Sequence, residues 1–315
     1  MERKLKTPKL THCGIIANYQ CTAACRHCLY ACSPARSPGY ISRKTAREIG
    51  RLLRAGGCEA VHIGGGEPFL DFDGLLSLIS EVHRAGIGLE YIETNAYWIE
   101  EEAQTKLERL LEAGGTTLCI SIDPFHAEYV PYSYPLRLQD LCEQTGMKYF
   151  LWQSRFIPAL TNLDPLKTHT WAELGNRGEI AQRYGIHWGG RAVNIEEEYA
   201  PRGNIILDAS PCSGLLSTGP FHADLLGNFI PPGCTGLRLP LAEAVEGVSA
   251  GKYPVFGALY FRGIRGLLDL AGDFVPAPGG YPSKCNLCFH LRRHLADQGF
   301  PELDKEYYEA ALAYW

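Results

Sequence analysis

Three cysteines stand close together near the start of the chain. Cys21, Cys25 and Cys28 are separated by three residues and then by two, in the stretch Cys-Thr-Ala-Ala-Cys-Arg-His-Cys. Three thiolates at this spacing can ligate three irons of a four-iron, four-sulfur cluster and leave the fourth iron open to another ligand. Zinc is the alternative, but structural zinc takes four ligands, and His27 or Cys32 would have to supply the fourth. The spacing therefore favours an iron–sulfur cluster.

A second group of cysteines lies in the last third of the chain. Cys285 and Cys288 have two residues between them, and Cys212 and Cys234 precede this pair. Four thiolates complete a metal site, so we expect an auxiliary [4Fe-4S] cluster here, with structural zinc as the alternative. Three solitary cysteines are expected to be packed thiols: Cys58, Cys119 and Cys142.

A short glycine-rich motif, Gly65-Gly66-Glu67-Pro68, adds polar groups to this chemistry. Consecutive glycines let a backbone edge approach a ligand closely, and the glutamate offers an anion to an ammonium group. A phosphate-binding loop is the rival interpretation. It is disfavoured because a carboxylate repels phosphate and proline lacks the N–H that phosphate would need.

The two motifs resemble those of the radical S-adenosylmethionine (radical SAM) superfamily. CxxxCxxC follows the first predicted strand, and Gly-Gly-Glu-Pro ends the second. The resemblance implies that Cys21, Cys25 and Cys28 hold a [4Fe-4S] cluster, and that the amino group of S-adenosyl-L-methionine meets Glu67 and the glycine backbone. It places further cofactor-binding residues at His27, Gly65, Gly66, Pro68, Thr94, Asn95, Ser121 and Asp123. Arg155 and Arg191 stand at the carboxyl ends of later predicted strands and are candidates to bind the carboxylate of S-adenosylmethionine. Two other roles for these arginines stay equally open: binding a substrate carboxylate, or forming an ion pair with a neighbouring acidic side chain at the rim.

The order of the later cysteines resembles the auxiliary-cluster domains called twitch and SPASM. With four candidate ligands, the smaller twitch form with one auxiliary cluster is the closer match. The implied reaction is reductive cleavage of S-adenosylmethionine to a 5′-deoxyadenosyl radical, which abstracts a substrate hydrogen. We expect peptide or protein modification, with small-molecule dehydrogenation or cofactor biosynthesis as the alternative and a flavodoxin or ferredoxin as electron donor. A non-catalytic iron–sulfur carrier is the rival class, but it has no use for Glu67 beside an open iron.

The elements that position these residues follow a repeating βα pattern. Apolar runs recur near 14–18, 59–63, 89–94, 117–122, 148–153 and 186–188, with helical periodicity between them, as at about 43–55 and 74–84. Five glycines follow predicted helices and are expected to end them in a left-handed conformation: Gly56, Gly86, Gly114, Gly146 and Gly185. The pattern predicts an α/β fold whose units wind into a barrel-like arc or a doubly wound sheet. The resemblance implies the first of these, a partial (β/α)6 TIM-like barrel whose motif residues share the carboxyl ends of the strands.

After about residue 195 this alternation stops and Pro-Gly-rich connections replace it. We therefore predict two domains, a barrel over 1–195 and a small irregular cluster-binding domain over 196–315 that ends in a helix.

Composition narrows the classes of protein further. The chain has 315 residues, 46% hydrophobic, and a formal charge of −5 from 30 basic and 35 acidic residues. This composition excludes a disordered chain. The negative net charge gives no basis for broad electrostatic binding to nucleic acid. No apolar run reaches the length of a membrane span, so we expect a cytoplasmic protein without membrane contact.

Overall fold

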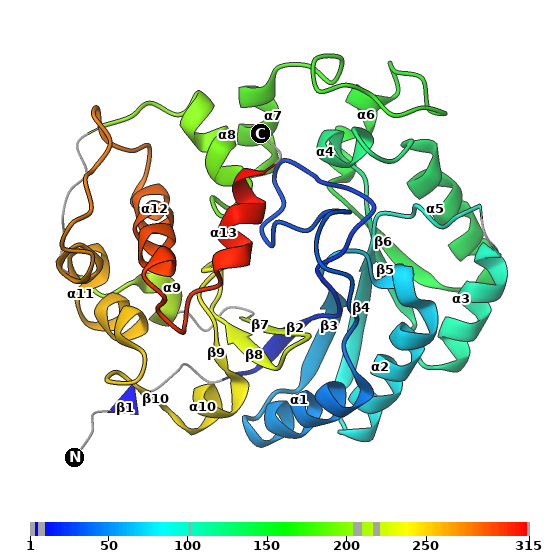
Figure 1. The fold of residues 1–315 in the computed structure, drawn as a ribbon. Coiled ribbons are helices and arrows are strands. Elements are labelled where there is room, and N and C mark those ends of the chain that lie inside the picture. Colours follow the sequence, from blue (N-terminus) through cyan, green and yellow to red (C-terminus); the bar gives the residue numbers. More distant parts are fainter. Residues whose placement is uncertain (1–3, 6–9, 101, 204–209, 217–220, 314–315) are drawn as a thin grey trace.

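The computed structural model describes residues 4–5, 10–100, 102–203, 210–216 and 221–313. Within these residues the fold is built around one eight-stranded sheet with the order β6-β5-β4-β3-β2-β7-β8-β9 (Figure 1). The strands are β2 (His12–Ile16), β3 (Ala60–Gly64), β4 (Gly88–Thr94), β5 (Thr117–Ser121), β6 (Lys148–Trp152), β7 (Phe221–Asp224), β8 (Asn228–Ile230) and β9 (Leu239–Pro240). Neighbours from β6 to β7 pair in parallel, whereas β8 and β9 are antiparallel. The predicted α/β class with a parallel sheet is confirmed.

Helices connect the parallel strands and bury their apolar faces against one side of the sheet. They are α1 (Arg43–Ala55), α2 (Phe72–Arg84), α3 (Ala103–Glu112) and α5 (Ser133–Thr145). Successive side chains of a strand point to opposite faces. Val61 and Ile63 therefore join the core under the helices, whereas His62 between them lies on the other face. The left-handed stop predicted at Gly56 is wrong, because Gly56 has φ −75° and the next residue, Gly57, takes φ 85°.

The sixth parallel strand is not the one that the sequence indicated. Residues 186–188 form no strand, because they are three residues that run directly into Gly189-Gly190, and Gly190 turns with φ 56° against the backbone of the cysteine loop. Instead β7 pairs with β2, the first strand of the barrel, on the side away from β6. A segment about 200 residues later in the chain thus closes the open edge of the sheet.

Shorter helices surround the carboxyl ends of the strands. They are η1 (Pro68–Asp71), α4 (Pro124–Ala127), η2 (Ser154–Phe156), α6 (Ile157–Leu160), α7 (Arg177–Tyr184) and α8 (Ala192–Tyr199). They follow β3, β5 and β6, so they lie at the end of the barrel where the motif residues are expected.

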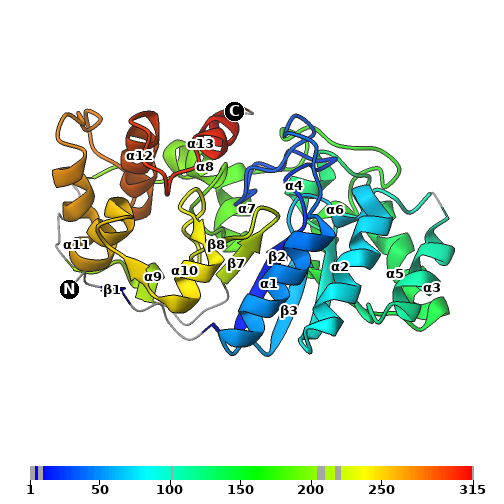
Figure 2. The same ribbon diagram turned by 60° about the horizontal axis from the view of Figure 1, so that its bottom comes forward.

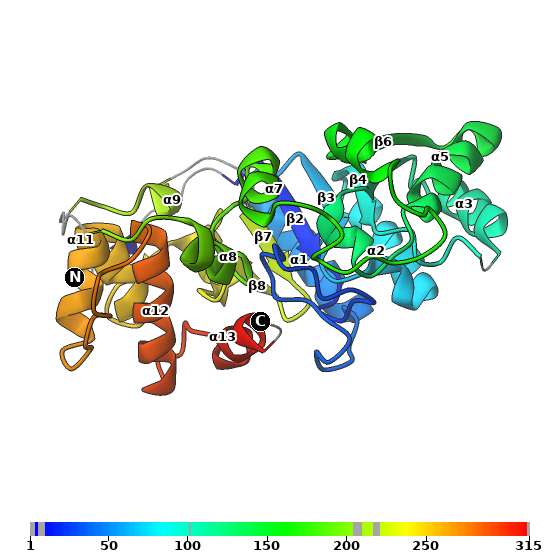
Figure 3. The same ribbon diagram turned by 90° about the horizontal axis from the view of Figure 1, so that it is seen from above.

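The last third of the chain lies beyond the β7 edge, away from α3 and α5 (Figures 2 and 3). It comprises α9 (Ser213–Leu216), α10 (Leu241–Glu246), α11 (Pro254–Leu270), α12 (Lys284–Asp297) and α13 (Lys305–Leu312), while β1 (Lys4–Leu5) pairs with β10 (Val248–Ser249). One buried apolar cluster includes Leu53 of the barrel and Leu267 and Leu291 of this region. Sheet and core continue across residue 195, and the two-domain division stays a prediction. Among the described residues, no helix has the length and hydropathy needed to cross a bilayer.

Candidate active site

A cavity of about 840 Å³ lies against the face of the sheet opposite α1, α2, α3 and α5. Its walls include residues of β4, β5 and β6 and the loops that follow β2, β3 and β6. Predicted site residues that line it are Cys21, Cys25, His27, Cys28, Gly65, Gly66, Thr94, Asn95, Ser121 and Arg155. Glu67, Pro68, Asp123 and Arg191 are absent from this lining. The fold therefore brings the cysteine loop and most of the expected cofactor residues to one cavity.

The cysteine loop is held in place from both sides. Cys21 donates its N–H to Ser33 at 3.2 Å, and Cys28 donates to the carbonyl of Cys25 at 3.0 Å. Arg191 immediately precedes α8, and its buried side chain donates Nε–H to the carbonyl of Cys25 at 2.9 Å and a terminal N–H to that of Cys32. Arg191 thus shapes the loop backbone rather than facing the cavity, where the sequence placed it.

The thiols of this loop have donors around them. The sulfur of Cys21 accepts from the N–H of Ala23 at 3.4 Å and from Asn95 Nδ2 at 3.7 Å, and that of Cys28 accepts from the N–H of Cys32 at 3.3 Å. A hydrogen bond with the Cys32 thiol lowers the pKa of Cys28 to about 5, whereas burial raises the pKa of Cys21. Hydrogen-bond donors to ligand sulfur are a normal feature of iron–sulfur sites, so this loop fits a cluster.

The spacing of the cysteines also bears on the zinc alternative. Among the described residues, the three metal-ligating side chains whose donor atoms all lie within 4.8 Å are His27, Asp123 and His126, without any cysteine. A tetrahedral zinc ion with Zn–S bonds near 2.3 Å holds its sulfurs about 3.8 Å apart.

Glu67 is engaged by its own chain. Its carboxylate accepts hydrogen bonds from the N–H of Asn95 at 2.8 Å, from Thr94 Oγ1 at 3.0 Å and from the N–H of Phe69 at 3.1 Å. Burial raises its pKa to about 7, against the lowering effect of these three donors. The sequence assigned this carboxylate to an ammonium group, but here it joins the loop after β3 to the end of β4. Pro68 beside it is buried as the first residue of η1.

Asp123 is likewise a positioning group. It caps α4 by accepting from the N–H of Phe125 at 2.9 Å, and its second oxygen lies 2.8 Å from Nδ1 of His126. Burial opposes the charge on His126, but Asp123 and then Cys25 raise its pKa well above the ordinary value. The imidazole of His126 lines the cavity beside the cysteine loop.

His27 occupies an aromatic pocket in the cavity wall. Its ring centroid is 4.5 Å from that of Phe125 and 4.7 Å from that of Tyr184, whose hydroxyl lies 3.0 Å from its Nε2. Burial lowers the pKa of His27 to about 3, so the ring is neutral. It can present a flat uncharged face to a ligand.

Several lining residues escaped the sequence analysis: Tyr91, Glu93, Tyr184, His187 and His222. Glu93 had a usable signal, since it is a charged residue inside an apolar strand run. His222 had none, because its segment pairs with β2 only through tertiary structure.

The four later cysteines also come together. Cys212 and Cys234 both lie beside Gly214, and Cys285 and Cys288 belong to the first turns of α12. A hydrogen bond with the Cys234 thiol lowers the pKa of Cys212 to about 6, while the charge of Cys212 contributes to the raised pKa of both Cys285 and Cys288.

A buried guanidinium, that of Arg292, faces this second group of thiols. Its charge contributes to the lowered pKa of Cys212 and opposes the raised pKa values of Cys234 and Cys288. It also donates to the carbonyl of Thr235 at 2.7 Å. A cation next to clustered thiols suits a site that holds thiolates.

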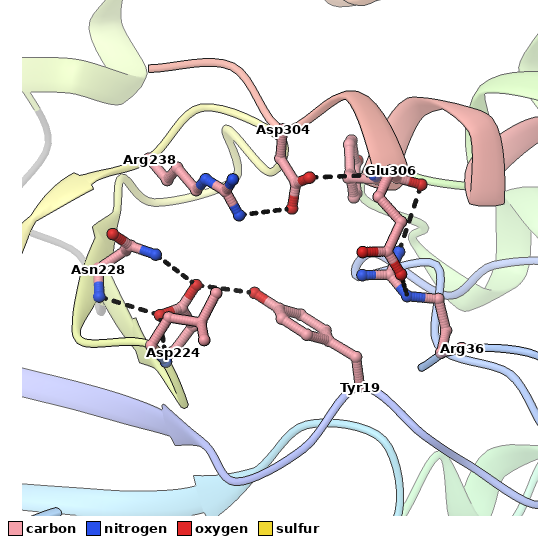
Figure 4. A network of polar contacts seen from close by, with 9 residues as sticks. Tyr19, Arg36, Asp224, Asn228, Arg238, Asp304 and Glu306 are labelled. Carbon is pink, nitrogen blue, oxygen red and sulfur yellow. Dashed lines mark hydrogen bonds and ion pairs between the residues drawn. The ribbon is translucent and has the colours of Figure 1, made fainter. Parts of the chain in front are cut away.

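Polar contacts fasten the cysteine loop to the last third of the chain (Figure 4). Tyr19 donates to Asp224 at 3.2 Å, and Arg36 pairs with Glu306 at 3.4 Å. The hydroxyl of Tyr307 on α13 donates to the carbonyl of Leu29 at 3.2 Å and shares a hydrogen bond with Thr235. Tyr307 therefore bridges the residues that follow Cys28 and Cys234.

Residues 15–145, which include the first cysteine loop and the glycine motif, match the family model of the radical SAM superfamily. The chain therefore contains a radical SAM domain. It is a radical SAM enzyme, and its cofactors are a [4Fe-4S] cluster and S-adenosylmethionine.

Solved structures similar to the chain were also found. Native anSMEcpe with bound AdoMet is 14% identical over 96% of each chain, with a TM-score of 0.46. BtrN in complex with AdoMet and 2-DOIA is 13% identical over 90% of this chain and 99% of its own, with a TM-score of 0.44. SuiB of Streptococcus suis is 16% identical over 84% of this chain and 68% of its own, also at 0.44. No curated protein matches the chain.

Proposed function

We propose that this radical SAM enzyme modifies a residue of a peptide or protein. The observation that carries the proposal is a pair of exposed aromatic side chains on the cavity wall. Trp152 is 48% exposed and Phe150 is 38% exposed, and both line the cavity that contains the cysteine loop. Exposed aromatic rings are characteristic anchors for protein and peptide partners. A cavity of about 840 Å³ is within the size range of small-molecule sites, so a peptide would insert one side chain and rest on the rim.

Cys21, Cys25 and Cys28 would ligate the cluster in this proposal. When bound, the cluster delivers one electron to S-adenosylmethionine, which yields methionine and a 5′-deoxyadenosyl radical that takes a hydrogen atom from the substrate. The chain's own groups would bind and orient S-adenosylmethionine and the substrate. Gly65 and Gly66 offer backbone to the cofactor.

The side chains that line the cavity would complete the cofactor site, namely His27, Thr94, Asn95, Ser121 and Arg155. Glu67, Asp123 and Arg191 would hold these elements in place through the hydrogen bonds described above. Their role is positioning, since none of the three faces the cavity.

Cys212, Cys234, Cys285 and Cys288 would hold an auxiliary [4Fe-4S] cluster in a twitch-like arrangement. Arg292 supports this assignment, because its buried charge offsets that of the clustered thiolates. A reduced flavodoxin or ferredoxin would supply the electron. The matched test is the iron content of the double variant Cys285→Ala/Cys288→Ala, which should fall by about four per chain.

Deuterium transfer tests the class of substrate. Host cells are grown in D2O, and their extract is separated into a peptide fraction and a small-metabolite fraction. Each is incubated anaerobically with the reconstituted enzyme, dithionite and unlabelled S-adenosylmethionine. We expect deuterium in 5′-deoxyadenosine from the peptide fraction. Deuterium from the metabolite fraction alone would favour the small-molecule alternative and contradict the proposal.

A further inference from the structure

The inner face of the sheet carries a polar cluster that the proposed reaction leaves without a role. Glu93 of β4 and His222 of β7 line the cavity, and His62 of β3 lies next to both. The clustering depends on two glycines. A side chain at Gly14 would collide with both imidazole rings, and one at Gly64 would collide with the carboxylate of Glu93. The three polar side chains thus occupy space that the glycines leave free.

The carboxylate of Glu93 has no strong ionic partner. The nearest basic nitrogen paired with it is Nε2 of His62, 3.9 Å from Oε1. Burial lowers the pKa of His62 to about 4 and that of His222 to about 3, so both rings are neutral near pH 7. Within the described part of the chain, no lysine or arginine pairs with Glu93. Arg155, the arginine that lines this cavity, donates instead to the carbonyl of Arg183 at 3.2 Å.

Aromatic rings pack against the two histidines next to this carboxylate. Tyr91 stacks on His62 with centroids 4.9 Å apart and an interplanar angle of 11°, and Phe150 meets Tyr91 edge-on at 5.2 Å. Tyr30 lies 5.1 Å from His222. Burial raises the pKa of Glu93 to about 7, and the positive charge of His126, which also lines the cavity, opposes this rise. A carboxylate that has no lysine or arginine partner among the described residues and lies near aromatic rings is a receptor for an organic cation.

We propose that Glu93, with the neutral rings of His222 and His62, receives a primary ammonium group of the substrate, such as that of a basic side chain. This inference rests on the proposed function, because it places the substrate in the cavity that holds the cofactors. A metal ion is the alternative ligand for this site, because two histidines and a carboxylate are also a common set of metal ligands. The geometry disfavours it, since these three are not among the described side chains whose donor atoms all lie within 4.8 Å.

The test measures binding of n-butylammonium to the anaerobic, reconstituted enzyme with S-adenosylmethionine present. Butyrate and 1-butanol are probes of the same length with negative and no charge. Saturation-transfer NMR should show n-butylammonium bound at least about ten-fold more tightly than either. Glu93→Gln should remove most of this preference, and Glu93→Asp should restore part of it. Glu100→Gln is the matched control, because Glu100 pairs with Arg137 on the surface.

Thermal unfolding verifies that each variant folds. Equal binding of butyrate and n-butylammonium, or an amine preference that survives in Glu93→Gln, would overturn the inference. A Glu93-dependent Mn²⁺ signal without amine preference would also overturn it, in favour of a metal site. Formation of 5′-deoxyadenosine is assayed on the same samples. If it proceeds while the amine preference is missing, only the inference fails; if it is missing while amines bind, the proposed function fails.

Discussion

The carboxylate of Glu67 accepts the backbone N–H of Asn95 at a distance of 2.8 Å. This bond, with those from Thr94 and Phe69, ties the loop after β3 to the end of β4. The glycine backbone on one side and Asn95 on the other are thereby held on the same cavity wall. These hydrogen bonds fix the position of the loop after β3 relative to the end of β4.

Glu67→Gln tests this role. The amide keeps one acceptor but turns an N–H toward a group that already donates, so we expect a loss of about 1–3 kcal/mol in the free energy of unfolding and weaker binding of S-adenosylmethionine. Urea unfolding and calorimetric titration measure the two effects. Asp73→Asn on the exposed surface of α2 is the control. Unchanged stability with strongly weakened binding would instead mark Glu67 as a direct ligand.

Arg191→Lys should loosen the cysteine loop. A lysine has one ammonium group and cannot bond the carbonyls of Cys25 and Cys32 with the fixed fork of a guanidinium. We expect the visible absorbance of the first cluster to bleach several-fold faster in air. Arg51→Lys, in an exposed pair with Glu48, is the control and should bleach at the wild-type rate. Equal rates for Arg191→Lys and wild type would exclude this holding role.

Tyr307→Phe should disturb both cysteine sites at once. Its hydroxyl joins Leu29 and Thr235, and losing these bonds should cost about 1 kcal/mol of stability. We also expect altered EPR signals from both reduced clusters. Tyr308→Phe is the matched control, because the buried Tyr308 hydroxyl has no hydrogen-bond partner within the described part of the chain. Signals identical to wild type in the Tyr307 variant would show that the two sites are independent of this bridge.

Glu81 gives the barrel an acid-sensitive component of stability. Hydrogen bonds from Arg47 and then Arg43 lower the pKa of its carboxyl to about 2. A lowered pKa stabilises the folded state at pH values above the ordinary pKa of 4.5, and this contribution is lost as the pH falls from there towards 2. Glu81→Gln should therefore be less stable than wild type at pH 6, and the difference in urea unfolding should shrink below pH 4. A difference independent of pH would contradict the assigned cause.

Local sequence patterns predicted much of the barrel and the first cysteine site. The recurrence of apolar runs predicted the positions of β2 to β6. The short spacing of Cys21, Cys25 and Cys28 predicted that the three thiols share one loop. Contacts between distant segments were beyond such patterns. The pairing of β7 with β2 and the bonds from Arg191 to the cysteine loop join residues about 160 to 210 positions apart. The hydrogen bonds of Glu67 were also beyond local patterns, because Asn95 and Thr94 reach it only after β4 pairs with β3.

The central claim is that Cys21, Cys25 and Cys28 hold a cluster with an iron that is open to S-adenosylmethionine. The most direct measurement is 5′-deoxyadenosine formed from S-adenosylmethionine and dithionite under anaerobic conditions, with iron content determined on the same samples. Wild type and the packed-thiol control Cys58→Ala should form it. The triple variant Cys21→Ala/Cys25→Ala/Cys28→Ala should lose about four irons per chain and form none. A colourless zinc protein, or undiminished product from the triple variant, would contradict the account.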